Sequence, residues 1–242
     1  GARCGTSPAH GSSRLNLLAL GQAIGHVWPV KSVFYLFVAA LVVGCCAVKP
    51  MKDHSAKSIF DGKTFSGWEG NMDFFRIEDG SIVAGRLTEK IPNNEFLCTT
   101  SEYENFELNL KFKIVGSPQA NAGVQFRTKR IPNHHEVIGF QADIGQKYWG
   151  ALYDESRRRK ILAGPPAEDI PKIANIDGWN DYRIVARGNR IQLFLNGHNT
   201  VDYLEEDPEI AKSGVIALQV HSGPACEIWY KDISIIEYPA GN

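Results

Sequence analysis

The chain has 242 residues, of which 43% are hydrophobic, with 26 Lys and Arg against 27 Asp and Glu and a formal net charge of -1. This composition excludes disorder over the whole length. It also argues against nucleic acid as a partner, because phosphate binding needs a concentrated group of Lys and Arg. The length fits one large all-β domain or two small domains.

The N-terminal part of the chain is typical of an export signal. Residues 1–29 contain no acidic residue, and we expect them to be an unstructured leader or to precede the true start. The apolar run at 33–43 is too short for a bilayer-spanning helix, which needs about 20 residues, so 30–44 is predicted to be a secretory signal. Residues 42–45 resemble the lipobox of bacterial lipoproteins. That resemblance implies lipidation of Cys45, a tether at 45–58 and an envelope location, with membrane contact only through the lipid.

From residue 59 onward, short runs with a period of two predict antiparallel strands with one buried face. The clearest runs are 106–114, 182–186, 191–195, 214–220 and 227–236. The dipeptides Asp79-Gly80, Gly188-Asn189 and Asn196-Gly197 predict tight hairpin turns between strands. The best helix candidate, 207–212, is barely one turn. We therefore expect an all-β domain at 59–239, with two antiparallel sheets packed over one core.

Several motifs then follow in an order that resembles one family. They are 60–68 (FDGKTFSGW), 121–127 (NAGVQFR), 150–153 (GALY), 179–180 (WN), 195–197 (LNG) and 214–223 (GVIALQVHSG). Together they resemble the 3-keto-disaccharide hydrolase domain, formerly domain of unknown function 1080, whose fold is similar to concanavalin A-like lectins and glucanases. The resemblance implies a jelly-roll sandwich that receives sugar and acts on disaccharides oxidised at carbon 3. A non-catalytic, lectin-like binding module is the alternative, because this fold also hosts lectins.

Three predicted strands each place a pair of polar side chains on one face of an otherwise apolar run. The pairs are Gln125 with Arg127, Gln141 with Asp143, and Gln219 with His221. If these strands are neighbours, the pairs line one cleft, and the opposite faces belong to the core. The predicted core residues include Leu110, Phe112, Ile216, Leu218 and Val220.

Sugars also stack on aromatic rings, and Tyr148, Trp149 and Tyr153 follow Asp143 in the chain. Of these we expect Trp149 to contact the substrate, although core packing explains it equally well, and we expect Tyr153 to pack in the core. The basic run at 157–160 is expected to be a solvated loop or hairpin edge. Glu155 precedes it as a functional carboxylate or, more simply, as its ion-pair partner.

The chain lacks the closely spaced carboxylates that retaining glucanases of this fold carry on one strand. A ketone at carbon 3 changes the requirement, because it acidifies the proton at carbon 2 and permits elimination of the group at carbon 1. We therefore predict Asp143 as general base, His221 as the acid for the leaving oxygen, and Arg127 with Gln141 as stabilisers of the enolate. Gln125, Gln219 and Glu136 complete the expected substrate-binding set, with Glu136 as the reserve base.

No cofactor and no metal site is expected. His134 and His135 are adjacent, so in a strand they point to opposite faces, and no other cluster has metal-ligand spacing. Cys98 and Cys226 lie in strand-like runs and are expected to be buried free thiols.

Overall fold

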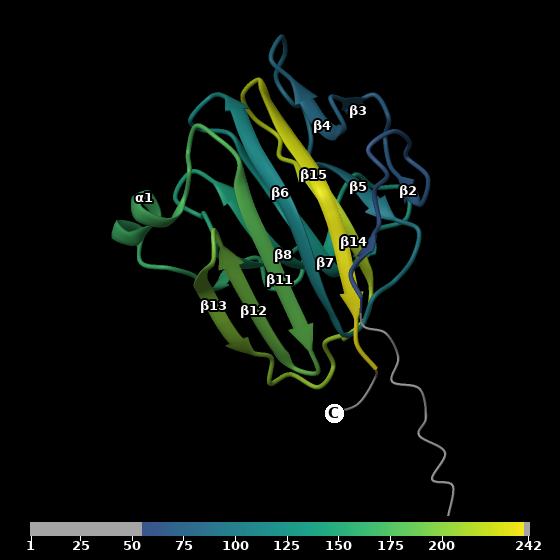
Figure 1. The fold of residues 1–242 in the computed structure, drawn as a ribbon, viewed down its shortest axis with the longest axis vertical. Coiled ribbons are helices and arrows are strands. Elements are labelled where there is room, and N and C mark those ends of the chain that lie inside the picture. Colours follow the sequence, from purple (N-terminus) through teal and green to yellow (C-terminus); the bar gives the residue numbers. More distant parts are fainter. Residues whose placement is uncertain (1–54, 240–242) are drawn as a thin grey trace, which may run out of the picture. The chain divides into compact units, whose positions relative to one another are not determined.

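The computed structural model describes residues 55–239, which form two antiparallel sheets packed face to face (Figure 1). The predicted signal at 30–44, Cys45 and most of the tether lie outside the described residues. Within residues 55–239, no helix has the length and apolar character that a membrane-spanning helix needs.

The sheet that faces the viewer in Figure 1, here called sheet A, is built around the two longest strands of the domain. In spatial order it contains β13 (His198–Leu204), β12 (Arg190–Leu195), β11 (Asn180–Arg187), β6 (Phe106–Gly116), β15 (Cys226–Glu237), β4 (Ser81–Arg86) and β3 (Phe75–Glu78), with β1 (Lys57–Ser58) paired to β15. Burial along β6 alternates residue by residue, as the period of two at 106–114 predicts.

The second sheet, here called sheet B, lies behind sheet A in Figure 1. Its order is β10 (Ile161–Ala163), β9 (Leu152–Glu155), β8 (Val137–Gly145), β7 (Asn121–Arg130), β14 (Val215–Val220), β5 (Glu95–Thr99) and β2 (Trp68–Glu69). The predicted polar pairs therefore lie on three adjacent strands, β8, β7 and β14. Unlike β6, these strands are buried along most of their length on both faces.

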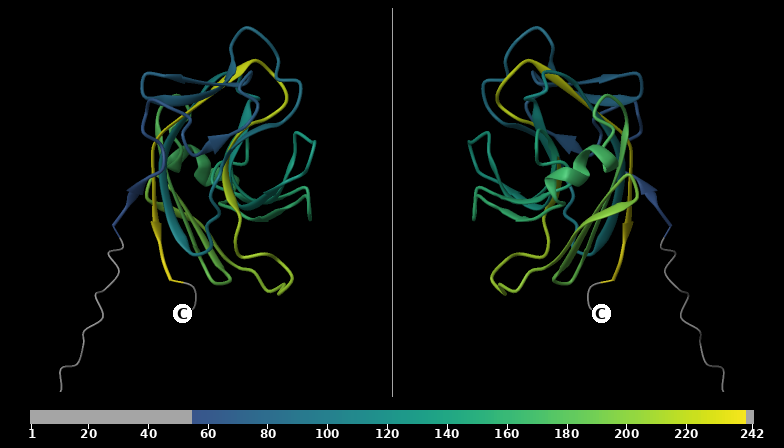
Figure 2. Two further views of the ribbon diagram at one scale, coloured as in Figure 1. Left: turned by 90° about the vertical axis from the view of Figure 1, so that its right-hand side faces the viewer. Right: turned by 90° about the vertical axis from the view of Figure 1, so that its left-hand side faces the viewer.

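The core lies between the two sheets, which Figure 2 shows edge-on as two facing layers. All five residues that the sequence assigns to the core are there, at 0% exposure for Phe112, Ile216, Leu218 and Val220 and 3% for Leu110. Cys98 and Cys226 are buried free thiols, as expected. The all-β sandwich prediction is confirmed.

The hairpin turns also follow the sequence. Asp79 and Gly80 join β3 to β4, and Asn196 and Gly197 join β12 to β13, all four with positive φ. The left-handed conformation at both central positions matches the twist of the flanking strands.

The one predicted helical turn is at the wrong position in the chain. Residues 207–212 form turns and bends, whereas a short 3-10 turn, η1 (Ala167–Asp169), and one helical turn, α1 (Ile170–Ile173), connect β10 to β11. Pro171 stands in the first turn of α1, where its missing N–H removes no intrahelical bond. One such turn has too few residues to show a helical period in the sequence.

Candidate functional site

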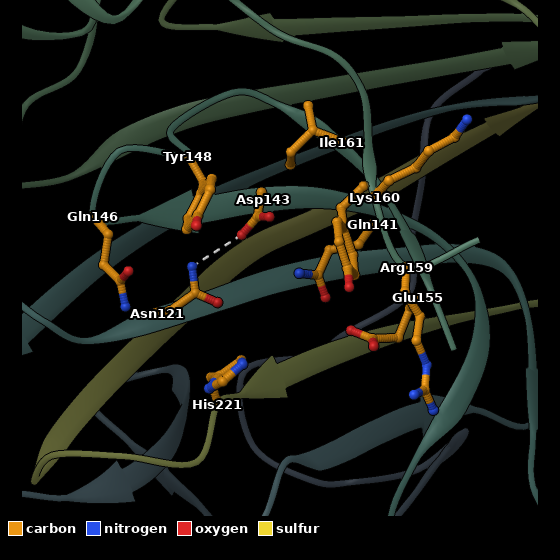
Figure 3. Close-up of a pocket in the computed structure, with 11 residues that line it drawn as sticks. Asn121, Gln141, Asp143, Gln146, Tyr148, Glu155, Arg159, Lys160, Ile161 and His221 are labelled. Carbon is orange, nitrogen blue, oxygen red and sulfur yellow. Dashed lines mark hydrogen bonds between the residues drawn. The ribbon is translucent and has the colours of Figure 1, made fainter. Parts of the chain in front are cut away.

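A cavity of about 470 Å³ opens on the face of sheet B that is turned away from the core, a size typical of small-molecule sites (Figure 3). It is lined by Asn121, Gln141, Asp143, Gln146, Tyr148, Tyr153, Glu155, Arg159, Lys160, Ile161 and His221. Most of these side chains are polar or aromatic, which suits a ligand with many hydroxyl groups.

The strand register explains why these side chains meet. Gln141 on β8 is directly opposite Tyr153 on β9, and Asp143 on β8 is opposite Gly123 on β7. Glu155 is opposite Gly139, so residues on alternate positions of β8 and β9 face the cavity together.

Asp143 is held beneath the cavity surface at 4% exposure. Its Oδ1 accepts hydrogen bonds from Asn121 Nδ2 at 3.0 Å and from the backbone N–H of Ile144 at 3.1 Å. Burial, with a smaller contribution from the negative charge of Glu155, raises the pKa of Asp143 to about 7 in spite of these donors.

Glu155 is the second carboxyl group of the cavity. Burial, followed by the nearby charge of Glu136, raises its pKa to about 7, and Arg159 opposes this shift. Two carboxyl groups with pKa values near neutrality in one cavity are typical of acid–base sites, because one can hold a proton while the other accepts one.

His221 follows the end of β14 and borders the cavity opposite Asp143 (Figure 3). Its Nδ1 lies 2.7 Å from the carbonyl oxygen of Ser222. A carbonyl can only accept, so Nδ1 carries the hydrogen and Nε2 is the acceptor of the neutral ring.

Arg127 does not reach the cavity, contrary to the sequence-based prediction. The register of β7 shifts between Phe126 and Lys129, and Arg127 has φ of +47°, so the expected alternation with Gln125 is broken. Its guanidinium donates to the carbonyls of Glu104 and Gly188 at 2.8–3.0 Å. Burial lowers the pKa of Arg127 to about 10. The side chain thus links the segments that contain Glu104 and Gly188, outside the cavity lining.

The roles expected for two aromatic residues are exchanged. Trp149 is 3% exposed and packs against Phe112, with ring centroids 5.9 Å apart, so it belongs to the core. Tyr153, which we expected in the core, lines the cavity together with Tyr148. The turn between β8 and β9 decides this, because residues 145–151 depart from strand alternation.

The other three expected ligands lie around the cavity without lining it. Gln125 and Gln219 are 0% exposed and do not belong to the lining. Within the described residues, neither amide atom of Gln219 has a hydrogen-bond partner. Glu136 accepts a hydrogen bond from Asn94 at 3.0 Å and acts on the cavity through its charge, which reaches Glu155.

The basic run divides between two faces. Arg157 and Arg158 pair with the fully buried Asp154, and Arg158 also pairs with Glu205. Arg159 and Lys160 line the cavity. Glu155 therefore faces the cavity, while its neighbour Asp154 is the partner of the arginines. The strict alternation of 152–155 was the sequence signal for this.

Among the described residues, no group of three or more His, Cys, Asp or Glu side chains is arranged to hold a metal ion. The cavity lining includes the Asp143 and Glu155 carboxyl groups and the His221 ring, which are groups that can accept or donate protons.

The model of the 3-keto-alpha-glucoside-1,2-lyase-like domain matches residues 55–236. The chain belongs to this family. The search of curated proteins found no match.

Solved structures share the fold at low sequence identity. A Parabacteroides distasonis protein provisionally called a glycosyl hydrolase is 17% identical, with a TM-score of 0.59 over 77% of this chain and 95% of that one. A second such protein from the same species is 23% identical, with a TM-score of 0.55 over 76% and 100%. The carbohydrate-binding module CBM66 of Bacillus subtilis is 13% identical, with a TM-score of 0.53 over 71% and 96%.

A Bacillus subtilis protein with a galectin-like fold aligns with a TM-score of 0.55 at 11% identity, over 77% of this chain and 100% of that one. The domain is therefore a jelly-roll sandwich with a galectin-like fold. Its family places it among carbohydrate-active domains of the glycosyl hydrolase-like or carbohydrate-binding class.

Proposed function

We propose that this domain cleaves the glycosidic bond of disaccharides oxidised at carbon 3. The observation that carries the proposal is the pair of carboxyl groups, Asp143 and Glu155, that share one cavity and have pKa values of about 7. A pair in this range supplies both a base and an acid at neutral pH.

The ketone at carbon 3 allows one base and one acid to carry out the reaction. A base removes the proton from carbon 2, the electron pair forms the double bond between carbons 1 and 2, and the bond from carbon 1 to the glycosidic oxygen breaks. An acid gives that oxygen a proton, so the leaving sugar departs as an alcohol. Addition of water across the new double bond, with oxygen to carbon 1 and hydrogen to carbon 2, completes a net hydrolysis.

The surroundings of the two carboxyl groups support a different role for each. Asp143 accepts N–H groups from Asn121 and Ile144, which stabilise its ionised form, so it is the base. Glu155 lies near the charge of Glu136, which favours its protonated form, so it is the acid in place of the predicted His221.

The remaining lining groups hold the sugar. Tyr148 and Tyr153 offer rings for the C–H faces, and Nε2 of His221 accepts from a hydroxyl. Arg159 and Lys160 bring positive charge to the cavity, which favours the enolate that forms when carbon 2 loses its proton.

Turnover of a matched pair of glycosides tests the proposal. The protein is incubated with a 3-keto disaccharide and, separately, with the same disaccharide bearing a hydroxyl at carbon 3. We expect release of free sugar from the ketone only. Release from neither compound contradicts the proposal.

A second candidate function is sugar binding without catalysis, because a carbohydrate-binding module shares this fold. Calorimetry with the same two compounds separates the two functions. Saturable binding without release supports the binding module.

We also propose that the domain is exported and anchored by a lipid on Cys45, on the strength of the lipobox-like residues 42–45. Expression in a bacterial host followed by fractionation tests this. The parent protein is expected with the membranes and the Cys45→Ser variant in the soluble fraction, and a Cys45→Ser protein that stays with the membranes contradicts the anchor.

A further inference from the structure

A short row of buried amide side chains lies below the cavity. Gln125 on β7 and Gln141 on β8 are opposite each other in register, at 0% and 2% exposure. The Nε2 of Gln125 donates to Oε1 of Gln141 at 2.6 Å, and Thr128 Oγ1 donates to Oε1 of Gln125 at 3.1 Å. Only Gln141 of these three residues lines the cavity.

In the structure these two bonds run in one direction along the row. An amide has a donor end and an acceptor end, and Thr128 occupies the acceptor of Gln125. The donor of Gln125 meets the oxygen of Gln141, so the nitrogen of Gln141 is turned toward the Asp143 carboxyl group, where it favours the ionised form and lowers the pKa. Figure 3 shows this nitrogen on the side of Asn121 and Asp143.

Two glycines leave the space that the row occupies. A Cβ on Gly123 would lie 2.4 Å from Cδ of Gln141, and a Cβ on Gly139 would lie 1.8 Å from Oγ1 of Thr128. Neither glycine has a positive φ, so both are needed for room and not for backbone conformation. The row is thus built into the pairing of β7 with β8.

We propose that Gln125 is a positioning residue, which acts through Gln141 to hold an N–H group against the carboxylate of Asp143 and so fixes that carboxylate toward the cavity. The role of Asp143 rests on the proposed function. Gln125 touches no part of the cavity and reaches the chemistry only by way of Gln141.

Titration of Asp143 by NMR of its 13C-labelled carboxyl group tests the proposal without any substrate. The signal is assigned by its loss in Asp143→Asn. Gln141→Met removes the N–H group and should raise the midpoint by about one pH unit, as expected for one hydrogen bond to a charged group. Gln125→Met, which leaves Asp143 and Gln141 in place, should raise it in the same direction by a smaller amount.

The double variant decides whether the two residues act in series. Gln125→Met should add nothing to the shift of Gln141→Met, because its effect passes through the missing amide. A Gln125→Met midpoint equal to that of the parent, or a full additional shift in the double variant, contradicts the proposal.

Two threonines provide a milder test should Gln125→Met fail to fold. Thr128→Val removes only the hydroxyl at the start of the row and should raise the midpoint. Thr200→Val makes the same change at a buried threonine of sheet A, whose hydroxyl bonds the carbonyl of Leu193, and should leave it unchanged. Equal midpoints in Thr128→Val and Thr200→Val contradict the proposal.

The titration tests the role of Gln125, and the turnover assay tests the proposed function, so a negative result in one does not decide the other. A shifted midpoint in a protein without turnover removes the proposed function and leaves the row intact. Where turnover is present, the acidic limb of kcat/KM should move to higher pH in Gln125→Met by the shift seen in the titration. If Gln125→Met turns over substrate and neither the acidic limb of kcat/KM nor the titration midpoint of Asp143 shifts, only the role of Gln125 is contradicted.

Discussion

The outer faces of the two sheets carry polar residues in very different surroundings. On sheet A they are solvated and paired, as in Arg183 with Glu107 and Arg190 with Asp202, with the arginine side chains 40% and 59% exposed. On sheet B, Gln125, Gln141 and Asp143 have at most 4% exposure. Solvated pairs contribute little to stability, whereas a buried carboxyl group has an altered pKa. This difference is the reason for assigning the proposed chemistry to sheet B.

The largest expected effect is on turnover. Asp143→Asn should lower kcat/KM for a 3-keto glycoside by about 10² to 10⁴, the usual contribution of a general base. Asp181→Asn makes the same change on sheet A, where the side chain is 65% exposed, and should leave kcat/KM unchanged. Equal kinetics in the two variants would remove the distinction between the faces.

Truncating a core side chain should lower the free energy of unfolding in either sheet, whatever residues the outer face of that sheet carries. Leu218→Ala, at a fully buried position of β14, should lower the free energy of unfolding by about 2 to 5 kcal/mol. Urea unfolding measures this. A loss below about 1 kcal/mol would show that sheet B does not pack on the core as described.

The buried carboxyl group of sheet B should also make the stability of the protein depend on pH. Asp143 has its pKa raised by burial to about 7, so the folded state holds a proton that the unfolded state releases near pH 4. Stability from this group is complete below about pH 4 and falls as the pH rises to about 7. The three-unit shift corresponds to at most about 4 kcal/mol.

Asp143→Asn should therefore reduce the fall in unfolding free energy between about pH 4 and 7, and the part that remains should come from Glu155, whose pKa burial also raises to about 7. Thermal unfolding over this range compares it with Asp181→Asn, which should keep the slope of the parent. A parent protein that gains stability over this range from Asp143 would contradict the raised pKa.

Arg127 tests whether a buried charge outside the cavity serves structure alone. Arg127→Lys loses the fork that binds the carbonyls of Glu104 and Gly188 and should reduce stability by about 2 to 3 kcal/mol. Its kcat/KM should match that of the parent at a temperature where both are folded. A selective loss of kcat in a stable Arg127→Lys protein would show that Arg127 contributes to catalysis.

The sequence predicts the fold well because period-two burial and hairpin turns are local properties. The alternation at 106–114 becomes β6, and Asn196-Gly197 becomes the turn between β12 and β13. The sequence also predicts that Gln141, Asp143 and His221 meet, and they line one cavity because β8 and β14 both pair with β7.

The errors at the site come from departures from regular strands. A positive φ at Arg127 breaks the alternation on which its assignment depended. The turn that follows β8 sends Trp149 into the core and leaves Tyr148 at the cavity. For Glu155, the sequence offers two neighbouring carboxylates as partners of the basic run, and the structure shows that Asp154 is the one that pairs with Arg157 and Arg158.

The most direct test of the proposed chemistry follows the proton at carbon 2. The protein is incubated with a 3-keto disaccharide in D2O, and NMR monitors both the released sugar and deuterium at carbon 2 of the 3-keto product. We expect release accompanied by deuterium at that carbon, with both lost in Asp143→Asn and retained in Asp181→Asn. Release that leaves the original hydrogen on carbon 2 would contradict proton abstraction by Asp143.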